Sequence, residues 1–185
     1  MLWTKAIPAK QRIKEIEEGL KRNFIETIQH PDEIEKLLTD LLTSANEEIL
    51  IIFSSANTML RYEREGLIQL LLDAESKRSV KIRILVEKAD LTNEVARGLL
   101  KEQYPQIEFQ YLDKSLKTRV TTLIIDSEFS LAIELKDDSK ENSSEAMGLA
   151  SYSNSESTVS SYVSIFESLW IQAELNGSKL KPLEN

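Results

Sequence analysis

Short apolar segments alternate with amphipathic segments through the middle of this chain, and the alternation limits the folds open to it. The apolar segments are EEILIIFSS from Glu47, VKIRILVE from Val80 and IEFQYL from Ile107. The first is almost wholly apolar, as expected of a strand that is covered on both faces. Strands that alternate with helices need crossover connections, so the pattern predicts a mainly parallel sheet with helices on both sides.

The segments between these strands have helical character. One helix is expected from about Thr58 to Ser76, and a second over TNEVARGLLKEQ, residues 92–103. The first helix carries apolar residues at helical spacing, which we interpret as its buried stripe: Leu60, Leu67, Leu71 and Ala74.

The stretch KTRVTTLIIDSEFSLAIELKDD, residues 117–138, predicts a hairpin that extends the sheet in the antiparallel sense, with Asp126 near its turn. A polar loop, KDDSKENSS, follows, and we expect it to be mobile. One more strand is expected over EAMGLASYS, residues 145–153. The last helix is predicted from about Ser155 to Leu175, with a wide apolar stripe: Val159, Tyr162, Val163, Phe166, Leu169, Trp170 and Ala173.

The first 45 residues predict helices rather than strands. One helix is expected from Pro8, with Ile13, Ile16, Leu20 and Phe24 facing inward. A second begins at Pro31 and runs to about Ala45. We therefore divide the chain into an N-terminal helical extension, residues 1–45, and an α/β domain, residues 46–185.

Composition excludes several classes of site. The chain has no cysteine and one histidine, so thiolate zinc sites and histidine clusters are ruled out, and we expect neither a metal nor a cofactor. A net charge of -8 argues against a nucleic-acid surface. The longest apolar segments are far shorter than the ~20 residues that span a bilayer, and no signal peptide is visible, so we expect a soluble, cytoplasmic domain without membrane insertion.

The hairpin segment RVTTLIID, together with the order of strands and helices around it, resembles phospholipase D-like enzymes. Their motif is His, any residue, Lys, four residues and Asp, and it places Arg119 at the His position, Thr121 at the Lys position and Asp126 at the Asp position. The resemblance implies a phospholipase D-like mixed sheet with helices on both faces. It also implies that the nucleophile and the phosphate-binding cation are missing, because a guanidinium stays protonated and a hydroxyl carries no charge.

Two interpretations of this hairpin remain open. In the first, Arg119 and Lys117 are candidates for binding an anion at the mouth of a pocket that has the shape of the catalytic site but lacks its catalytic residues. Alternatively, Asp126 forms the turn and Arg119 is a surface residue of a strand. Glu134 and Lys136 lie further along, on one side of the second strand, and either pair with each other or line the same pocket.

A second candidate site follows the first strand, in SSANTMLRYER. Ser54, Ser55 or Asn57 can cap the next helix, and ligands of open α/β sheets collect where strands end and helices begin. Asn57, Arg61 and Arg64 share one helical face. This face either binds an anion or a metabolite, or is simply solvated, and the spacing alone favours solvation.

Longer phrases resemble a sensory region of archaeal sensor histidine kinases: RIKEIEEGLKRNFIETI, SANEEILIIFSSAN and the segment from Thr122 to Trp170. The resemblance implies a cytoplasmic input domain for signal transduction in a two-component system, with kinase domains downstream in the same chain. The apolar stripe of the last helix suits a dimer seam, so we expect a homodimer.

The function expected on these grounds is a non-catalytic sensor domain that binds a small anionic or sugar-like ligand. It passes a change through its terminal helices to an output domain. Three alternatives stay open: the effector-binding domain of an archaeal transcription regulator, a phosphodiesterase with unconventional residues, and a dimerisation module without a ligand.

Overall fold

The computed structural model describes residues 23–87, 103–113 and 118–178. Within them the chain forms one seven-stranded sheet of order β1-β7-β6-β5-β2-β3-β4. Its strands are β1 Ile25–Ile28, β2 Glu48–Ile52, β3 Lys81–Glu87, β4 Glu108–Leu112, β5 Val120–Ile125, β6 Phe129–Leu135 and β7 Met147–Ser153. The helices in these residues are α2 Pro31–Ser44, α3 Ala56–Arg64, α4 Leu67–Arg78, α6 Ser143–Ala146 and α7 Glu156–Ser178.

The sheet is mixed, as predicted. β2, β3 and β4 are parallel, in agreement with the crossover pattern. The hairpin β5–β6 extends the sheet in the antiparallel sense, with β5 against β2, and β7 follows β6. The expected helix over 92–103 lies outside the described residues except at its last position.

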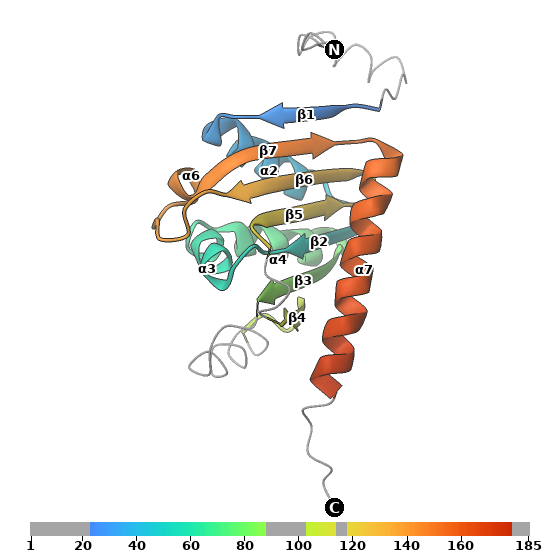
Figure 1. The fold of residues 1–185 in the computed structure, drawn as a ribbon. Helices are drawn as coiled ribbons and strands as arrows, with labels where there is room; N and C mark the ends of the chain where they lie inside the picture. Colours follow the sequence, from blue (N-terminus) through green and yellow to red (C-terminus); the bar gives the residue numbers. More distant parts are fainter. Residues whose placement is uncertain (1–22, 88–102, 114–117, 179–185) are drawn as a thin grey trace, which may run out of the picture.

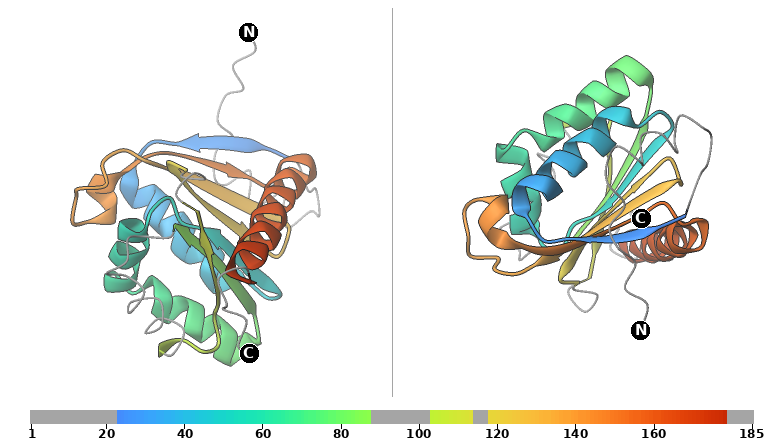
Figure 2. Two further views of the ribbon diagram at one scale, coloured as in Figure 1. Left: turned by 60° about the horizontal axis from the view of Figure 1, so that its bottom comes forward. Right: turned by 90° about the horizontal axis from the view of Figure 1, so that it is seen from above.

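Helices cover both faces of the sheet, and each face has its own apolar core (Figure 1). The larger core lies between the sheet and α2, α3 and α4, and is built around buried residues such as Ile34, Leu71 and Ile84. The smaller core lies under α7 and contains Leu50, Leu85 and Phe166. Among the helices of the described residues, Figure 2 shows α7 on one side of the sheet and α2, α3 and α4 on the other. The predicted stripe of the last helix is confirmed, since Val159, Phe166, Trp170 and Ala173 are all buried.

The single helix predicted from Thr58 to Ser76 is wrong, because the chain bends between α3 and α4. Gly66 stands at the bend with φ of 91°, a left-handed conformation that favours glycine. The bend also changes the direction of the side chains that precede it. Leu60, expected in the buried stripe, is 44% exposed, whereas Leu67, Leu71 and Ala74 are buried as predicted.

β1 was not predicted, and it lies inside the segment interpreted as a helical extension. Ile25–Ile28 pairs antiparallel with β7 at the edge of the sheet. Phe24, expected to face inward from a helix, instead precedes this strand and packs on Tyr152 with ring centroids 5.5 Å apart. The rest of the first predicted helix lies outside the described residues. The second is confirmed as α2, which shares the larger core with the sheet.

Arg83 of β3 joins the sheet to α7. Its guanidinium lies over the Phe166 and Trp170 rings, at 5.2 and 5.4 Å from their centroids. It donates to both carboxylate oxygens of Glu167, with 3.0 Å between Nη1 and Oε2. These hydrogen bonds lower the pKa of Glu167 below its usual 4.5. The pair therefore holds α7 against the sheet by a bidentate charged contact as well as by apolar packing.

We expect Glu167→Gln to lower the free energy of unfolding by about 1 kcal/mol at neutral pH, a value discounted for the partial exposure of the carboxylate. Because the folded-state pKa is depressed, this contribution is complete above pH 4.5 and is lost as the pH falls below it. Urea titrations at several pH values would measure the difference. In an Arg83→Met background the same substitution should have little effect, and an equal effect there would contradict the pairing.

Candidate functional site

The end of β2 and the start of α3 form a buried cluster of hydroxyl groups. The Ser54 backbone N–H donates to Thr121 Oγ1 at 3.2 Å, and the Thr121 hydroxyl donates to Ser54 Oγ at 3.1 Å. Thr58 Oγ1 lies 3.0 Å from the hydroxyls of both Ser54 and Ser55. Ser55 also caps α3, since its Oγ accepts from the Thr58 N–H, as the sequence predicts. The cluster thus ties β2, β5 and α3 together.

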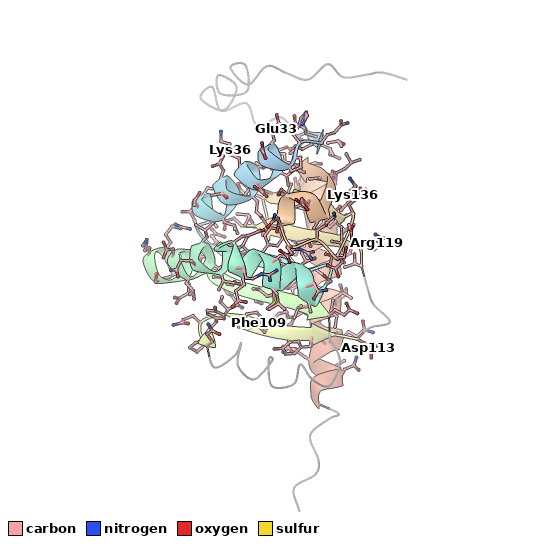
Figure 3. The ribbon with its side chains drawn as sticks, turned by 90° about the vertical axis from the view of Figure 1, so that its left-hand side faces the viewer. Glu33, Lys36, Phe109, Asp113, Arg119 and Lys136 are labelled. Carbon is pink, nitrogen blue, oxygen red and sulfur yellow. The ribbon has the colours of Figure 1, made fainter. Side chains whose placement is uncertain are left out.

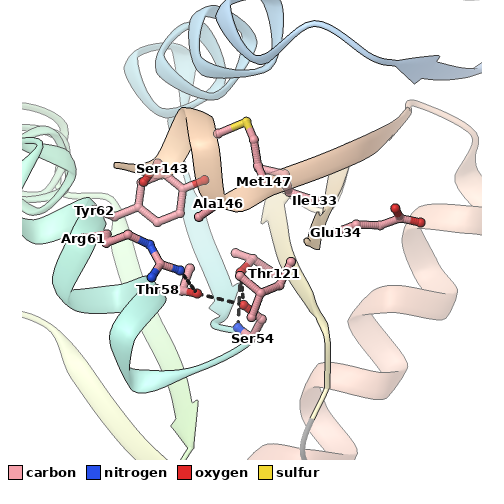
Figure 4. A pocket seen from close by; sticks show the side chains of 11 residues that line it. Ser54, Thr58, Arg61, Tyr62, Thr121, Ile133, Glu134, Ser143, Ala146 and Met147 are labelled. Carbon is pink, nitrogen blue, oxygen red and sulfur yellow. Dashed lines mark hydrogen bonds between the residues drawn. The ribbon is translucent and has the colours of Figure 1, made fainter. Parts of the chain in front are cut away.

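Arg61 lies beside this cluster and is only 2% exposed. The expectation of a solvated arginine face is therefore wrong at this position, while Asn57 and Arg64 are exposed. Arg61 Nη2 donates to Thr58 Oγ1 at 2.9 Å (Figure 4). Its Nη1 donates to the backbone carbonyls of Asp138 and Lys140 at 2.9 and 3.2 Å. A buried guanidinium is stable only when it is paired, and the polar loop after β6 supplies the partners.

Asp138 provides the negative charge that Arg61 requires. Its Oδ1 accepts from Arg61 Nη2 at 2.9 Å and from the Ser55 hydroxyl at 2.9 Å. Asn57 Nδ2 makes a longer contact, 3.5 Å, with Oδ2. Three residues predicted to contact an anion, Ser55, Asn57 and Arg61, therefore do surround a carboxylate, and that carboxylate belongs to the chain itself.

The space left inside this cluster is small. The cavity is about 10 Å³, roughly the room needed for one water molecule. Its lining includes Ser54, Thr58, Arg61, Tyr62, Thr121 and Ser143. Burial raises the pKa of Tyr62, so its phenol is neutral. Arg61 Nε and Ser143 Oγ are buried here without a hydrogen-bond partner among the described residues. With Asp138 in place, the site has no room for a metabolite.

The loop expected to be mobile is anchored instead. Besides the contacts with Arg61, the backbone N–H groups of Lys136 and Asp137 donate to the Ala146 carbonyl at 2.9 and 3.1 Å. The Ser143 N–H donates to Glu65 Oε1 at 2.8 Å. Asp138 was not predicted from the sequence as a site residue. A single acidic residue in a polar loop has no spacing that would mark it as part of a site.

Asp126 lies at the opposite end of the sheet from this cluster, because β5 runs antiparallel to β2. Its carboxylate accepts from the backbone N–H groups of Asn46, Glu47 and Glu48 at 2.8 to 3.2 Å. Both Asp126 and Ser127 have φ of 53°, as in a tight hairpin turn. The turn-forming interpretation of Asp126 is therefore confirmed, and Asp126, which was also a candidate ligand-binding residue, lies apart from the Arg61 cluster.

The remaining predicted residues lie outside the buried cluster. Arg119 is exposed, and its Nη2 donates to the carbonyls of Leu135 and Lys136, so Arg119 and Lys136 lie close together on the surface (Figure 3). Glu134 borders the cavity, but its carboxylate points away from it (Figure 4). Glu134 and Lys136 both line a wide, open groove of about 950 Å³ beside β7. No ion pair between them is found in the described residues.

The described residues hold no group of three or more His, Asp or Glu side chains that could bind a metal ion. Nor do they include a helix that is long and apolar enough to cross a membrane. The charged group inside the cluster is the guanidinium of Arg61, which donates to the Thr58 hydroxyl and to oxygens of Asp138 and Lys140. Chemically, this arrangement can hold an oxyanion, and the geometry shows it holding Asp138.

Comparison with solved structures identifies the fold. TrmBL2, an archaeal chromatin protein with a novel mode of DNA binding, is similar at a TM-score of 0.55 and 19% identity. The similarity covers 89% of this chain and 60% of TrmBL2, so the chain spans well under the full length of that protein. Nuc, a phospholipase D family member from Salmonella typhimurium, is similar at a TM-score of 0.59 and 15% identity, over 82% of this chain and 96% of Nuc.

NucT from Helicobacter pylori gives a TM-score of 0.60 at 10% identity, over 82% of this chain and 98% of NucT. No protein-family model and no curated protein sequence matches the chain. The chain therefore has the phospholipase D-like fold, and identities this low show the fold alone. None of these findings supports the histidine-kinase resemblance.

We expect Asp138→Asn to lower the free energy of unfolding by about 2 kcal/mol, because it leaves the buried Arg61 without a negative charge. Urea denaturation measures this loss. Glu141→Gln removes an exposed carboxylate from the same loop and is the matched control, with a change within about 0.5 kcal/mol. Equal effects of the two substitutions would show that Asp138 does not neutralise Arg61.

Proposed function

We propose that this chain is a non-catalytic regulatory domain whose Arg61 site exchanges Asp138 for a small external anion. The observation that carries the proposal is the set of groups around the Asp138 carboxylate. A buried guanidinium, the Ser55 hydroxyl and the Asn57 amide converge on one carboxylate at the start of a helix. The same donors suit the carboxylate or phosphate group of a metabolite.

The absence of catalysis is inferred from the motif positions. Thr121 stands at the position of the motif lysine, and its hydroxyl donates to Ser54. Arg119 stands at the position of the nucleophile, and it is exposed and donates to backbone carbonyls. Neither side chain can attack phosphorus, since one is permanently protonated and the other has no base among its hydrogen-bond partners. The chain's histidine, His30, precedes α2 and is not among the residues that line the cavity.

The conformational change that follows release of Asp138 would be transmitted to an output domain along the chain that follows Asp138. The loop that carries Asp138 continues into α6 and β7, and β7 leads into α7 (Figure 1). An anion that binds Arg61 only when Asp138 has left favours the conformation with the loop detached. Its differential affinity for the two conformations is what shifts their populations.

The likeness to TrmBL2 favours the effector domain of a DNA-binding regulator over the input domain of a kinase. TrmBL2 binds DNA, and this chain covers 60% of its length. Because the chain has a net charge of -8, we place any DNA contact in a part of the parent protein that corresponds to the rest of TrmBL2. The regulatory mechanism proposed here is the same for either output.

Chemical rescue tests the anion site. Asp138→Ala removes the carboxylate that Arg61 binds, and acetate supplies a small external carboxylate in its place. We expect acetate to raise the thermal unfolding midpoint of Asp138→Ala by a few degrees, with a smaller effect on the wild-type chain, where the site is filled. The double variant Asp138→Ala, Arg61→Met is the control and should show no rescue, while sodium chloride at equal ionic strength controls for screening.

Rescue that is absent, or that is equal in the double variant, would contradict an anion site at Arg61. The catalytic alternative is tested separately with bis(p-nitrophenyl) phosphate. We expect no turnover by the pure wild-type chain. Turnover that Thr121→Val or Arg119→Ala abolishes would instead support the phosphodiesterase.

A further inference from the structure

The solvent side of α7 carries a row of exposed, uncharged side chains. Its members recur at alternating spacings of four and three residues, which places them on one face of the helix. All of them are exposed, with Ile171 at 55% and Leu175 at 59%. We call this row the α7 seam: Ser157, Ser161, Ser164, Ser168, Ile171 and Leu175.

The seam lies directly opposite the face that α7 buries. Val159, Phe166, Trp170 and Ala173 pack on the sheet, about half a helical turn away from the seam. The intramolecular core therefore accounts for the apolar stripe of this helix and leaves the uncharged seam without a function in the monomer. The row keeps a heptad spacing over about 27 Å, and its two exposed apolar members, Ile171 and Leu175, lie together at its C-terminal end.

The serine hydroxyls of the seam can be buried at little cost. Ser161, Ser164 and Ser168 each donate to the backbone carbonyl four residues earlier, at 2.7 to 2.9 Å. Because their protons are already bonded within the helix, removing water from these side chains leaves no donor unsatisfied. Small side chains also let a second helix approach closely, and Ile171 and Leu175 add apolar area at one end of the row.

The seam is also uncharged, on a chain with a net charge of -8. Glu167 and Glu174 border it on one side, and both are held by contacts within the chain, to Arg83 and to Trp170 Nε1 respectively. Ile165 and Gln172 border it on the other side. Two molecules with a large negative net charge repel each other. Contact through this uncharged face avoids placing acidic side chains of the two molecules opposite one another.

We propose that the α7 seam docks onto the same seam of a second copy of this chain, with the two helices parallel. In a parallel pair Ile171 faces Ile171, Leu175 faces Leu175, and each serine faces a serine. Glu167 then lies across from Gln172 of the partner rather than from another glutamate. An antiparallel pair would instead set Leu175 against Ser157 and bring the two Glu167 side chains together.

The α7 seam is already formed in the monomer, before two copies associate. α7 is already folded and held by the smaller core and by Arg83, so pairing does not require a helix to form. In this dimer the C-terminal ends of the two α7 helices would lie side by side. Output domains connected to these ends would then also be adjacent. This inference does not depend on the proposed anion site, and either can fail without the other.

Analytical ultracentrifugation of substituted chains tests the surface. We expect the wild-type chain to dimerise, and Ile171→Arg to raise the dimer dissociation constant about tenfold or more by placing two like charges in the seam. Leu60→Arg makes the same change at an exposed leucine of α3 and is the matched control, with no effect expected. Circular dichroism and thermal unfolding should show that both variants fold as the wild type does.

Cysteine cross-linking tests the orientation, since the chain has no cysteine of its own. Ser161→Cys should form an intermolecular disulfide under mild oxidation if the helices are parallel, because residue 161 then faces itself. Ser76→Cys, on the exposed side of α4, is the control and should not cross-link. A wild-type monomer at the highest concentration reached, a dimer that survives Ile171→Arg, or cross-linking of Ser161→Cys no faster than Ser76→Cys would each overturn the proposal.

Discussion

A buried positive charge organises the end of this fold where β2 meets α3. Arg61 is removed from solvent, and a guanidinium in that position must have a negative partner and acceptors for its N–H groups. Asp138 supplies the charge, and the carbonyls of Asp138 and Lys140, with the Thr58 hydroxyl, supply acceptors. A polar loop with no apolar side chains to pack is thereby fixed against the domain. The same requirement underlies the proposed exchange of Asp138 for an external anion, because such an anion would also neutralise Arg61.

The pairing of β5 with β2 decides which motif residues meet. Antiparallel register brings Thr121 near the end of β2, where it bonds to Ser54, and sends Asp126 to the start of β2, where it binds three backbone N–H groups. One strand thus carries a residue of the buried cluster and a residue that fixes the turn, at opposite ends of the sheet. The fold keeps the phospholipase D-like frame, while the groups at the motif positions serve hydrogen bonding within the chain.

The proposed anion site and the proposed docking seam lie on opposite faces of the sheet. The face covered by α2, α3 and α4 contains the larger core and the Arg61 site, and the opposite face carries α7. β7 connects them, since it follows the loop of Asp138 and precedes α7. Arg83 fastens α7 to the sheet through Glu167 and two aromatic rings. A change at the loop therefore has a short covalent route to the helix whose outer surface remains available for a partner.

The sequence by itself determined the elements with strong local patterns. The apolar strands β2 and β3, the hairpin with its Asp126 turn, and the stripe of α7 follow from period and turn chemistry, which are properties of neighbouring residues. Tertiary structure alone decided the rest. β1 forms only because β7 offers an edge, and Leu60 becomes exposed because Gly66 bends the chain. Arg61 is buried because Asp138, 77 residues away, neutralises it, and no local pattern encodes a contact between two such distant residues.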